Sequence, residues 1–431
     1  MSFSLLNLLH AKNTSKTIFT LIAAALLLKV IVAIFTPLSS DFINMVYGVA
    51  FTKFYFSFRG PYTFSIYFLN LFYRVWLFLP ISHPPVNKIL GQFYFNPSLS
   101  AYMLVFLIKL PFIIFDVLLG LLLYKIIFLI TKDSYKSVVG IFSWLFNPYI
   151  FLVVEASGVV DVIGTFFAVL SFFLLIKEKV SLSGVALAIG VIARFYPLIF
   201  LPFYIILLIK EKKVSKIVKF LLPFIVILIF ALFPLIINYG YDKAIKLLLL
   251  MFIEYEEFLW FFGVPITSFT APSQSLSLII IAYILLLFRF YKGNFRLIEN
   301  LNESLLITLL AFFALGRWNS YYTLWFIPFL TVDCIINHVK RIYPFSLLFL
   351  LFLFNGMIHY FAFPDIFFFM PVKNTPLYII SRALHLIKET LTPGELLRTF
   401  LRSIFAGLCA IYSILILLRK PAKPFHSNVL K

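Results

Sequence analysis

The chain has 431 residues, of which 63% are hydrophobic and only 12% are charged, and its mean hydropathy is +1.05. No water-soluble core could bury that much apolar surface, so the composition excludes a soluble domain and indicates that lipid is the main solvent. The formal net charge of +19 does not indicate nucleic-acid binding, because the basic residues lie in short segments between apolar runs, where they set membrane orientation.

Apolar runs alternate with basic segments and predict an all-α polytopic bundle, a single integral membrane domain over residues 1–431. Because lysine and arginine gather on the cytoplasmic side, we expect about twelve crossings, in a range of roughly 10 to 13, with both termini inside. The first run is predicted to be a signal anchor that is retained. The predicted spans are residues 17–37, 102–130, 137–154, 162–176, 181–209 (a hairpin of two), 217–237, 275–290, 303–316, 321–336, 343–362 and 400–418.

The hairpin is predicted from its flanks. Residues 181–209 lie between lysine clusters at 177–179 and 210–213. Both clusters should be cytoplasmic, so the run between them must cross an even number of times. The break at Arg194-Phe195-Tyr196-Pro197 predicts two short helices with Arg194 at the turn.

Three longer segments should lie on the extracytoplasmic side, namely residues 38–100, 238–274 and 363–398. The first is aromatic and moderately polar, and part of it predicts amphipathic helices that lie in the membrane interface. Most of the carboxylates between spans fall on this side of the membrane, which predicts that the chemistry or ligand binding takes place there.

Asp41 is the first of these acids, and it follows the first span directly. One interpretation is a helix N-cap, because an aspartate before an apolar helix accepts backbone N–H bonds. The other is a general base that takes a proton from a sugar hydroxyl as it attacks.

Two acids near an outer turn and two ionisable residues within one span are the next candidates. Glu155 and Asp161 flank an outer turn and are either solvated turn residues or a second acid and hydrogen-bond acceptors for sugar hydroxyls. Lys109 and Asp116 lie seven residues apart in the second span, about two helical turns, so both should face one side of the helix. Ionisable groups at that depth normally face the bundle interior, and the pair serves either contacts between helices or, through Lys109, contact with a phosphate.

Two arginines stand at predicted outer hairpin tips, Arg194 and Arg317. An arginine fork matches a phosphate in a bidentate way, whereas the alternative role at such a position is anchoring in the interface. Together the two would suit an anionic lipid headgroup.

Four segments resemble, in order, those of polytopic glycosyltransferases of the C-type fold. The last of them resembles a segment of the mannosyltransferase that adds the first mannose to glycosylphosphatidylinositol. The segments are Lys109-Leu110-Pro111 with Asp116, Asn147-Pro148 with Glu155 and Gly158-x-x-Asp161, Gly184 to Gly190 with Arg194-Phe195-Tyr196-Pro197, and Asn319 to Pro328, which includes Tyr321.

The resemblance implies an all-helical bundle with an extracytoplasmic active site. The donor would be a hexose, foremost mannose, on polyprenyl or dolichyl phosphate, and the acceptor a lipid-linked glycan or glycolipid. The base would be the acid of the first outer segment, here Asp41. The other candidates would contact substrate, and they are Glu155, Asp161, Arg194, Lys109, Asp116, Arg317 and Tyr321.

The chain departs from the family in one respect. Some members carry two acids close together in the first outer segment, whereas Asp41 is the only acid between residues 38 and 100. We therefore expect neither a metal nor another cofactor. The membrane would be the plasma membrane of a prokaryote or the endoplasmic reticulum of a eukaryote.

Two other classes of function fit an apolar bundle. A transporter or lipid flippase usually shows inverted halves and ionisable residues near the midplane, and here Asp116, with Lys109, is the candidate for such a site. A non-catalytic scaffold for membrane enzymes would keep the same bundle.

Overall fold

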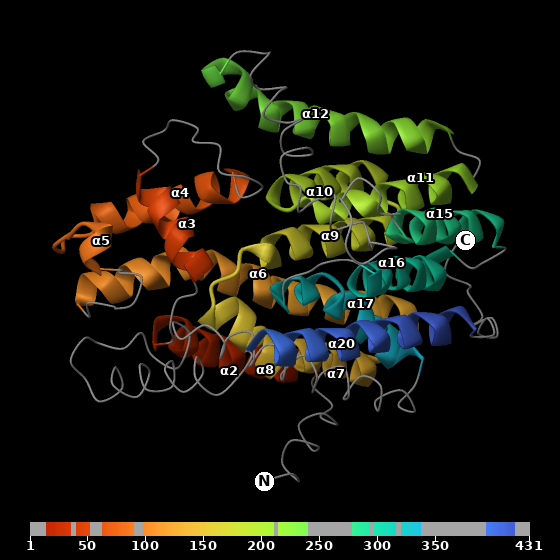
Figure 1. The fold of residues 1–431 in the computed structure, drawn as a ribbon, viewed down its shortest axis with the longest axis horizontal. Helices are drawn as coiled ribbons and strands as arrows, with labels where there is room; N and C mark the ends of the chain where they lie inside the picture. Colours follow the sequence, from red (N-terminus) through yellow and green to blue (C-terminus); the bar gives the residue numbers. More distant parts are fainter. Residues whose placement is uncertain are drawn as a thin grey trace, which may run out of the picture.

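A computed structural model describes residues 14–35, 40–51, 63–89, 98–210, 214–239, 278–293, 297–315, 320–337 and 394–418. These residues form helices joined by short turns and bends, with no strand among them. In Figure 1 most of the helices run along one common direction and stack in rows, from α12 in the uppermost row to α2, α7 and α20 in the lowest. The predicted all-α class is confirmed for the part of the chain that the structure describes.

Four helical stretches are long and apolar enough to cross a membrane, namely Ser15–Ile34, Leu99–Thr131, Ser134–Ala156 and Val214–Ala231. Shorter apolar helices accompany them, and many large apolar side chains of the bundle are exposed on its surface, including Phe19 at 72% and Phe230 at 69%. An apolar surface of this kind belongs in lipid rather than in water, so the chain is a polytopic membrane protein.

The helices of the bundle follow the predicted spans closely. They are α2 (Thr14–Phe35), α6 (Leu99–Thr131), α7 (Ser134–Leu145), α8 (Pro148–Ile150), a π-helix (Phe151–Ala156), α9 (Asp161–Ile176), α10 (Val180–Ala193), a 3-10 turn (Tyr196–Phe200), α11 (Leu201–Lys210), α12 (Val214–Tyr239), α15 (Leu278–Lys292), α16 (Leu297–Leu315), a 3-10 turn (Ser320–Trp325), α17 (Ile327–Ile336) and α20 (Gly394–Leu417). The predicted span at 343–362 lies outside the described residues, as do most of the outer segments at 238–274 and 363–398.

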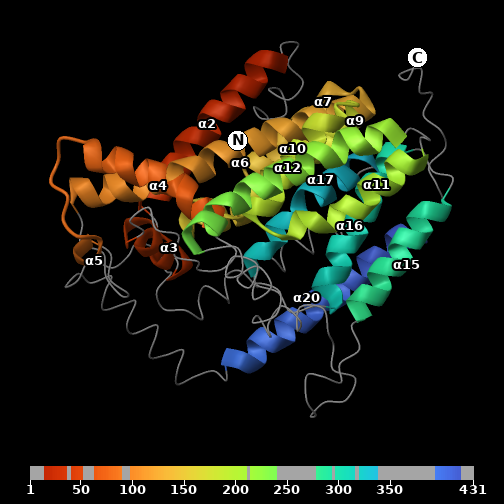
Figure 2. The same cartoon turned by 90° about the horizontal axis from the view of Figure 1, so that it is seen from above.

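The first outer segment contains three helices, α3 (Ser40–Phe51), α4 (Thr63–Phe78) and α5 (Val86–Ile89). They lie together at one end of the bundle, on the left in both views (Figures 1 and 2). The expected helices of this segment are therefore present, while their placement in the membrane interface stays a prediction.

Local sequence signals explain where the long helices begin and end. The Ser98 side chain accepts a hydrogen bond from the Ala101 amide at 3.1 Å and caps α6. Lys132 follows the end of α6 in the left-handed region at φ 56°, and Asp133 then caps α7 by accepting from the Lys136 amide at 3.1 Å. Since a side-chain acceptor satisfies one of the unpaired N–H groups at a helix start, the chain turns back tightly between α6 and α7.

The predicted hairpin over 181–209 is present. Helix α10 runs antiparallel to α9, since the Ser171 and Ser183 hydroxyls lie 3.0 Å apart at one end of the pair and Arg194 meets Asp161 at the other. The start of α10 packs on the start of α12, where a Cβ at Gly184 would collide with the Phe220 carbonyl. Helix α11 ends just before α12, so α10 and α11 run in opposite directions.

One end of the bundle carries the lysine-rich connections and is called here the basic end. It holds the turns at Lys132 and Lys136 and at Lys177 and Lys179, together with Lys210. Contacts between neighbouring helices bring these ends together. Gly140 of α7 packs near Ile335 of α17, and Asp333 of α17 accepts a hydrogen bond from Tyr412 of α20. Arg289 of α15 donates to the Leu417 carbonyl of α20, and Lys210 of α11 donates to the Phe290 carbonyl of α15. The predicted grouping of the basic segments on one side is thus matched by the geometry of the described helices.

Candidate functional site

The candidate residues gather at the opposite end of the bundle, called here the far end. The segment after α7 shapes it. Asn147 accepts a hydrogen bond from the Tyr149 amide at 2.9 Å, and Pro148 opens the short helix α8. A π-helix from Phe151 to Ala156 follows. Such wide turns are frequent at functional sites.

This helix continues two residues past the predicted span and carries Glu155 into the interior. Glu155 and Asp161 are both fully buried, so their interpretation as solvated turn residues is wrong. Gly158 lies between them with φ +69°, a conformation that side chains with a Cβ rarely adopt. A Cβ at Gly158 would also collide with the ring of Phe42, which brings α3 directly onto the turn.

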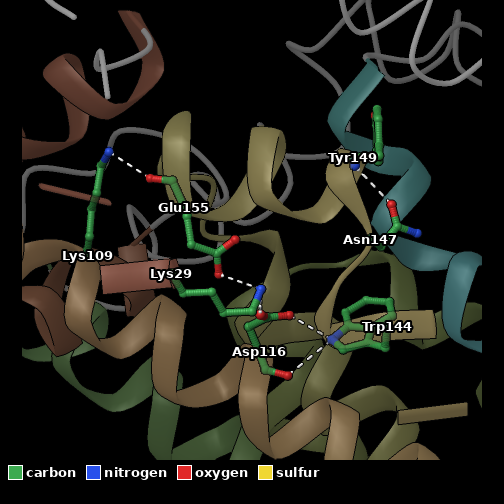
Figure 3. Close-up of polar contacts among 7 residues, drawn as sticks. All are labelled: Lys29, Lys109, Asp116, Trp144, Asn147, Tyr149 and Glu155. Atoms are coloured by element: carbon green, nitrogen blue, oxygen red, sulfur yellow. Dashed lines mark hydrogen bonds and ion pairs between the residues drawn. The ribbon is translucent and has the colours of Figure 1, made fainter. Parts of the chain in front are cut away.

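Lys109 holds the end of the π-helix. Its Nζ donates to the carbonyl oxygens of Glu155 and Ala156, each at 2.8 Å, and the side chain is fully buried. The last carbonyls of a helix have no partner within the helix, and Lys109 supplies donors for two of them. Figure 3 shows the bond to Glu155.

Lys29, Lys109, Asp116 and Glu155 form what is called here the Lys29 cluster. The Lys29 Nζ lies 2.5 Å from Asp116 Oδ2 and 3.1 Å from Glu155 Oε1. Trp144 Nε1 donates to Asp116 Oδ1 at 2.7 Å. All four charged side chains are fully buried, and Figure 3 shows Lys29 between the two carboxyl groups. The prediction that Lys109 and Asp116 face the bundle interior is confirmed.

Sequence reasoning missed Lys29. Lys29 is the one charged residue of the apolar run that is predicted to be the signal anchor. The signal was present, because a lysine well inside a membrane span needs a buried partner. Asp116 and Glu155, far along the chain, are those partners.

The second group at the far end is called here the Arg194 cluster and comprises Asp161, Arg194, Tyr196, Tyr322 and Trp325. Arg194 Nη2 donates to Asp161 Oδ2, and Trp325 Nε1 donates to Asp161 Oδ1 at 2.8 Å. Arg194 is 5% exposed, so it does not lie at the interface as an anchor would. A Cβ at position 164 of α9 would lie 2.8 Å from the Arg194 Cβ, so glycine is needed for this close approach.

Aromatic rings line one side of this pair. Trp325 stacks between Tyr196 and Tyr322, with ring centroids 4.3 and 4.4 Å apart and interplanar angles of 7° and 18°. Tyr321, a predicted substrate contact, is 8% exposed and meets Tyr322 edge-on at 4.8 Å. The Arg194 guanidinium lies 5.6 Å from the Tyr322 ring centroid, so the ion pair is shielded by aromatic surface.

Asp41 is the second residue of α3, inside its first turn, and its side chain lies outside the described residues. The adjacent Phe42 is fully buried against Gly158, and its ring centroid lies 5.4 Å from the Lys109 Nζ. The backbone at Asp41 is therefore next to the turn that carries Glu155 and Asp161. Arg317 lies outside the described residues, and its contact with a phosphate stays a prediction.

The hydrogen bonds of the two basic candidates go to protein atoms in this structure. Lys109 binds backbone carbonyls and Arg194 binds a carboxylate, so a phosphate would have to share or replace these partners. Among the described side chains, no group of three or more His, Cys, Asp or Glu residues could hold a metal ion, and metal dependence stays untested because the Asp41 side chain is outside that set. Comparison with family models and with curated proteins finds no match to this chain.

Proposed function

We propose that the chain is a membrane-embedded glycosyltransferase. It moves a hexose, foremost mannose, from polyprenyl or dolichyl phosphate to a lipid-linked glycan or a glycolipid on the extracytoplasmic side. The proposal includes twelve crossings with both termini in the cytoplasm, so that the far end of the bundle faces outward. The membrane is the plasma membrane of a prokaryote or the endoplasmic reticulum of a eukaryote.

One observation carries the proposal more than any other. Phe42 packs on Gly158 beside Lys109, which brings the start of α3, and so the backbone of Asp41, to the turn between Glu155 and Asp161. The segments that resemble the glycosyltransferase family are spread from residue 109 to residue 328. Their polar residues that the structure describes meet at this one end of the bundle, as an active site requires.

The chemistry asks for a base and a group that stabilises the departing phosphate. Asp41 takes the proton from an acceptor hydroxyl as its oxygen attacks the anomeric carbon. The bond from that carbon to the phosphate oxygen breaks, and the lipid phosphate leaves with the electron pair. Arg317, with Arg194 released in part from Asp161, binds the developing negative charge. A direct displacement of this kind inverts the anomeric configuration.

The expected independence from metal follows from the leaving group. A lipid monophosphate leaves without a diphosphate that a cation would have to neutralise, and arginine or lysine supplies the countercharge. The donor tail reaches the site between helices, which accounts for an enzyme buried in lipid.

The test is sugar transfer in proteoliposomes. Full-length protein is supplied with mannosyl-phosphoryl polyprenol and a glycolipid acceptor, and Asp41→Asn is compared with Asp242→Asn, an acid of the second outer segment with no assigned role. We expect Asp41→Asn to lower turnover by about 100-fold or more, since general bases contribute on that order, and Asp242→Asn to keep it. Full turnover by a folded Asp41→Asn protein would remove this residue from the mechanism.

A transporter or flippase is the second candidate, and the Lys29 cluster favours it. Two carboxyl groups that share one ammonium inside a membrane bundle are typical of ion or proton pathways. Uptake of a labelled solute or flipping of a labelled lipid by the same proteoliposomes, without sugar transfer, would support this class. The two candidates are thus separated in one preparation.

A further inference from the structure

The Lys29 cluster contains one carboxyl oxygen that its neighbours do not serve. Both oxygens of Asp116 face donors, Lys29 Nζ at 2.5 Å and Trp144 Nε1 at 2.7 Å. Glu155 has Lys29 at 3.1 Å from Oε1, whereas Oε2 accepts no hydrogen bond from any described residue. The Glu155 side chain is 0% exposed. A buried acceptor without a donor is costly, and more so when it carries negative charge.

The neighbouring basic side chains do not donate to Glu155 Oε2. Lys29 is shared with Asp116, and its ammonium also lies 4.2 Å from the Phe151 ring centroid. Lys109 is close, but the two hydrogen bonds that it makes go to the carbonyl oxygens of Glu155 and Ala156. Helix α7 contributes Trp144, whose N–H is used by Asp116. No described donor therefore contacts Glu155 Oε2.

Two neighbouring carboxyl groups commonly hold one proton between them, which avoids the repulsion of two negative charges. The Glu155 and Asp116 carboxyl groups are close neighbours, because both contact the same Lys29 ammonium, at 3.1 and 2.5 Å. The proton belongs on Glu155, because one Asp116 oxygen accepts from Trp144 and the other lies 2.5 Å from the Lys29 ammonium, whereas no described donor contacts Glu155 Oε2. A protonated Glu155 then becomes a donor itself.

We propose that the Lys29 cluster is a proton-binding site, in which Glu155 carries a proton that it donates toward Asp116. The site is built from α2, α6 and the π-helix, at the point where Lys109 holds the helix end. The inference uses no part of the proposed sugar transfer, and it applies equally to an enzyme and to a transporter.

The proton would couple the cluster to the start of α3. Loss of the proton leaves two carboxylates against the Lys29 ammonium, while the Lys109 ammonium stays bound to the carbonyl oxygens of Glu155 and Ala156. The repulsion between the carboxylates acts on the backbone at Glu155. That backbone leads within three residues to Gly158, which seats Phe42 and the start of α3. The protonation of Glu155 therefore sets how the helix that bears Asp41 rests on the turn.

Neutral replacements of the two acids test whether Glu155 carries a proton or is ionised. The full chain is purified in detergent, and thermal unfolding of Glu155→Gln is compared with that of Asp116→Asn. The amide of Glu155→Gln keeps a donor where the proton was, so we expect the melting temperature to change by less than about 2 °C. Asp116→Asn leaves Lys29 without its ionised partner, so a fall of about 5 °C or more is expected. An equal or larger fall for Glu155→Gln would overturn the proposal.

Infrared spectroscopy gives a second, independent measurement. The wild type should show a protonated carboxyl stretch that shifts in deuterated buffer and that is missing from Glu155→Gln. The control is Glu178→Gln, because Glu178 is an exposed acid at the basic end that pairs with Lys216 at 3.4 Å, and it should leave the band unchanged. A wild-type spectrum without the band, or a band that survives in Glu155→Gln, would contradict the assignment. Neither measurement involves sugar transfer, so a failure here is distinct from failure of the proposed function.

Discussion

The two buried ionic clusters are built on the same plan and differ in one member. In each, an aspartate on one helix receives a basic side chain and an indole N–H: Asp116 receives Lys29 and Trp144, and Asp161 receives Arg194 and Trp325. In the Arg194 cluster, both oxygens of the one acid receive a donor. The Lys29 cluster contains a second acid, Glu155, that competes for the same ammonium.

Because of this difference, the Arg194 cluster has one charge state, whereas the Lys29 cluster can gain or lose a proton. A single acid with a single base and a full set of donors has one favourable charge state. Two acids that contact the same ammonium can hold a proton between them. We therefore expect the Arg194 cluster to respond to substitution mainly through stability, and the Lys29 cluster to respond through its charge state as well.

Breaking the Arg194 pair should have the largest effect. Arg194→Met leaves Asp161 buried with Trp325 as its described donor, and the loss of one member of a buried pair costs about 3–5 kcal/mol. The measurement is the free energy of unfolding in detergent. The control is Lys216→Met, which removes an exposed pair with Glu178 and should cost less than about 1 kcal/mol. Similar losses in the two variants would show that the Arg194 pair is not a structural element.

The second largest loss of stability is expected when Lys109, which caps the π-helix, is replaced. Lys109→Met has a similar length but cannot donate, so two carbonyl oxygens at 2.8 Å lose their partner. The expected cost is about 2–4 kcal/mol, below that of Arg194→Met because the groups left behind are neutral. Hydrogen exchange of amides in the 151–160 segment should rise in this variant, and unchanged exchange there would contradict the role of Lys109 as a cap.

The contrast between the clusters also shows what the sequence could reveal. Hydropathy and the spacing of lysines predicted the helices and the hairpin at Arg194, because lipid solvation and membrane orientation depend on local composition. The same patterns leave Glu155 either as a solvated turn residue or as a second acid of the site, since local composition does not show that a π-helix extends the span to Ala156. Local patterns predict where a helix lies better than where it ends.

Contacts between residues that are distant in the sequence cannot be predicted from such local patterns. Asp161 and Arg194 were both candidates, but nothing in a single sequence joins residues 33 positions apart, and both indole donors were overlooked. Lys29 was hidden for a different reason, because one lysine hardly lowers the hydropathy of an apolar run. A buried cation is recognised only when its acids are known.

A smaller effect is expected at the turn that joins the clusters to α3. Gly158→Ala places a Cβ in a left-handed conformation and against the Phe42 ring, which should cost about 2–3 kcal/mol. The additional substitution Phe42→Leu makes room for the Cβ and should recover part of the stability. If the proposed transferase function is correct, Gly158→Ala lowers kcat more than it raises KM, because the position of Asp41 changes rather than the binding of substrate. A change in KM alone would argue against that link.

The smallest expected effect gives the sharpest comparison, because it removes the same group from both clusters. Trp325→Phe and Trp144→Phe each delete an N–H that lies 2.8 or 2.7 Å from a buried carboxylate oxygen. A hydrogen bond to a charged group contributes about 1.5–3 kcal/mol, and Asp161 has no second acid to replace it. Asp116 does, because the proton on Glu155 can turn toward the oxygen that Trp144 leaves. Trp144→Phe should therefore cost less than Trp325→Phe, by about 1 kcal/mol, and adding Glu155→Ala to both should remove most of that difference. Equal costs in the two single variants would mean that the second acid holds no proton that Asp116 can use.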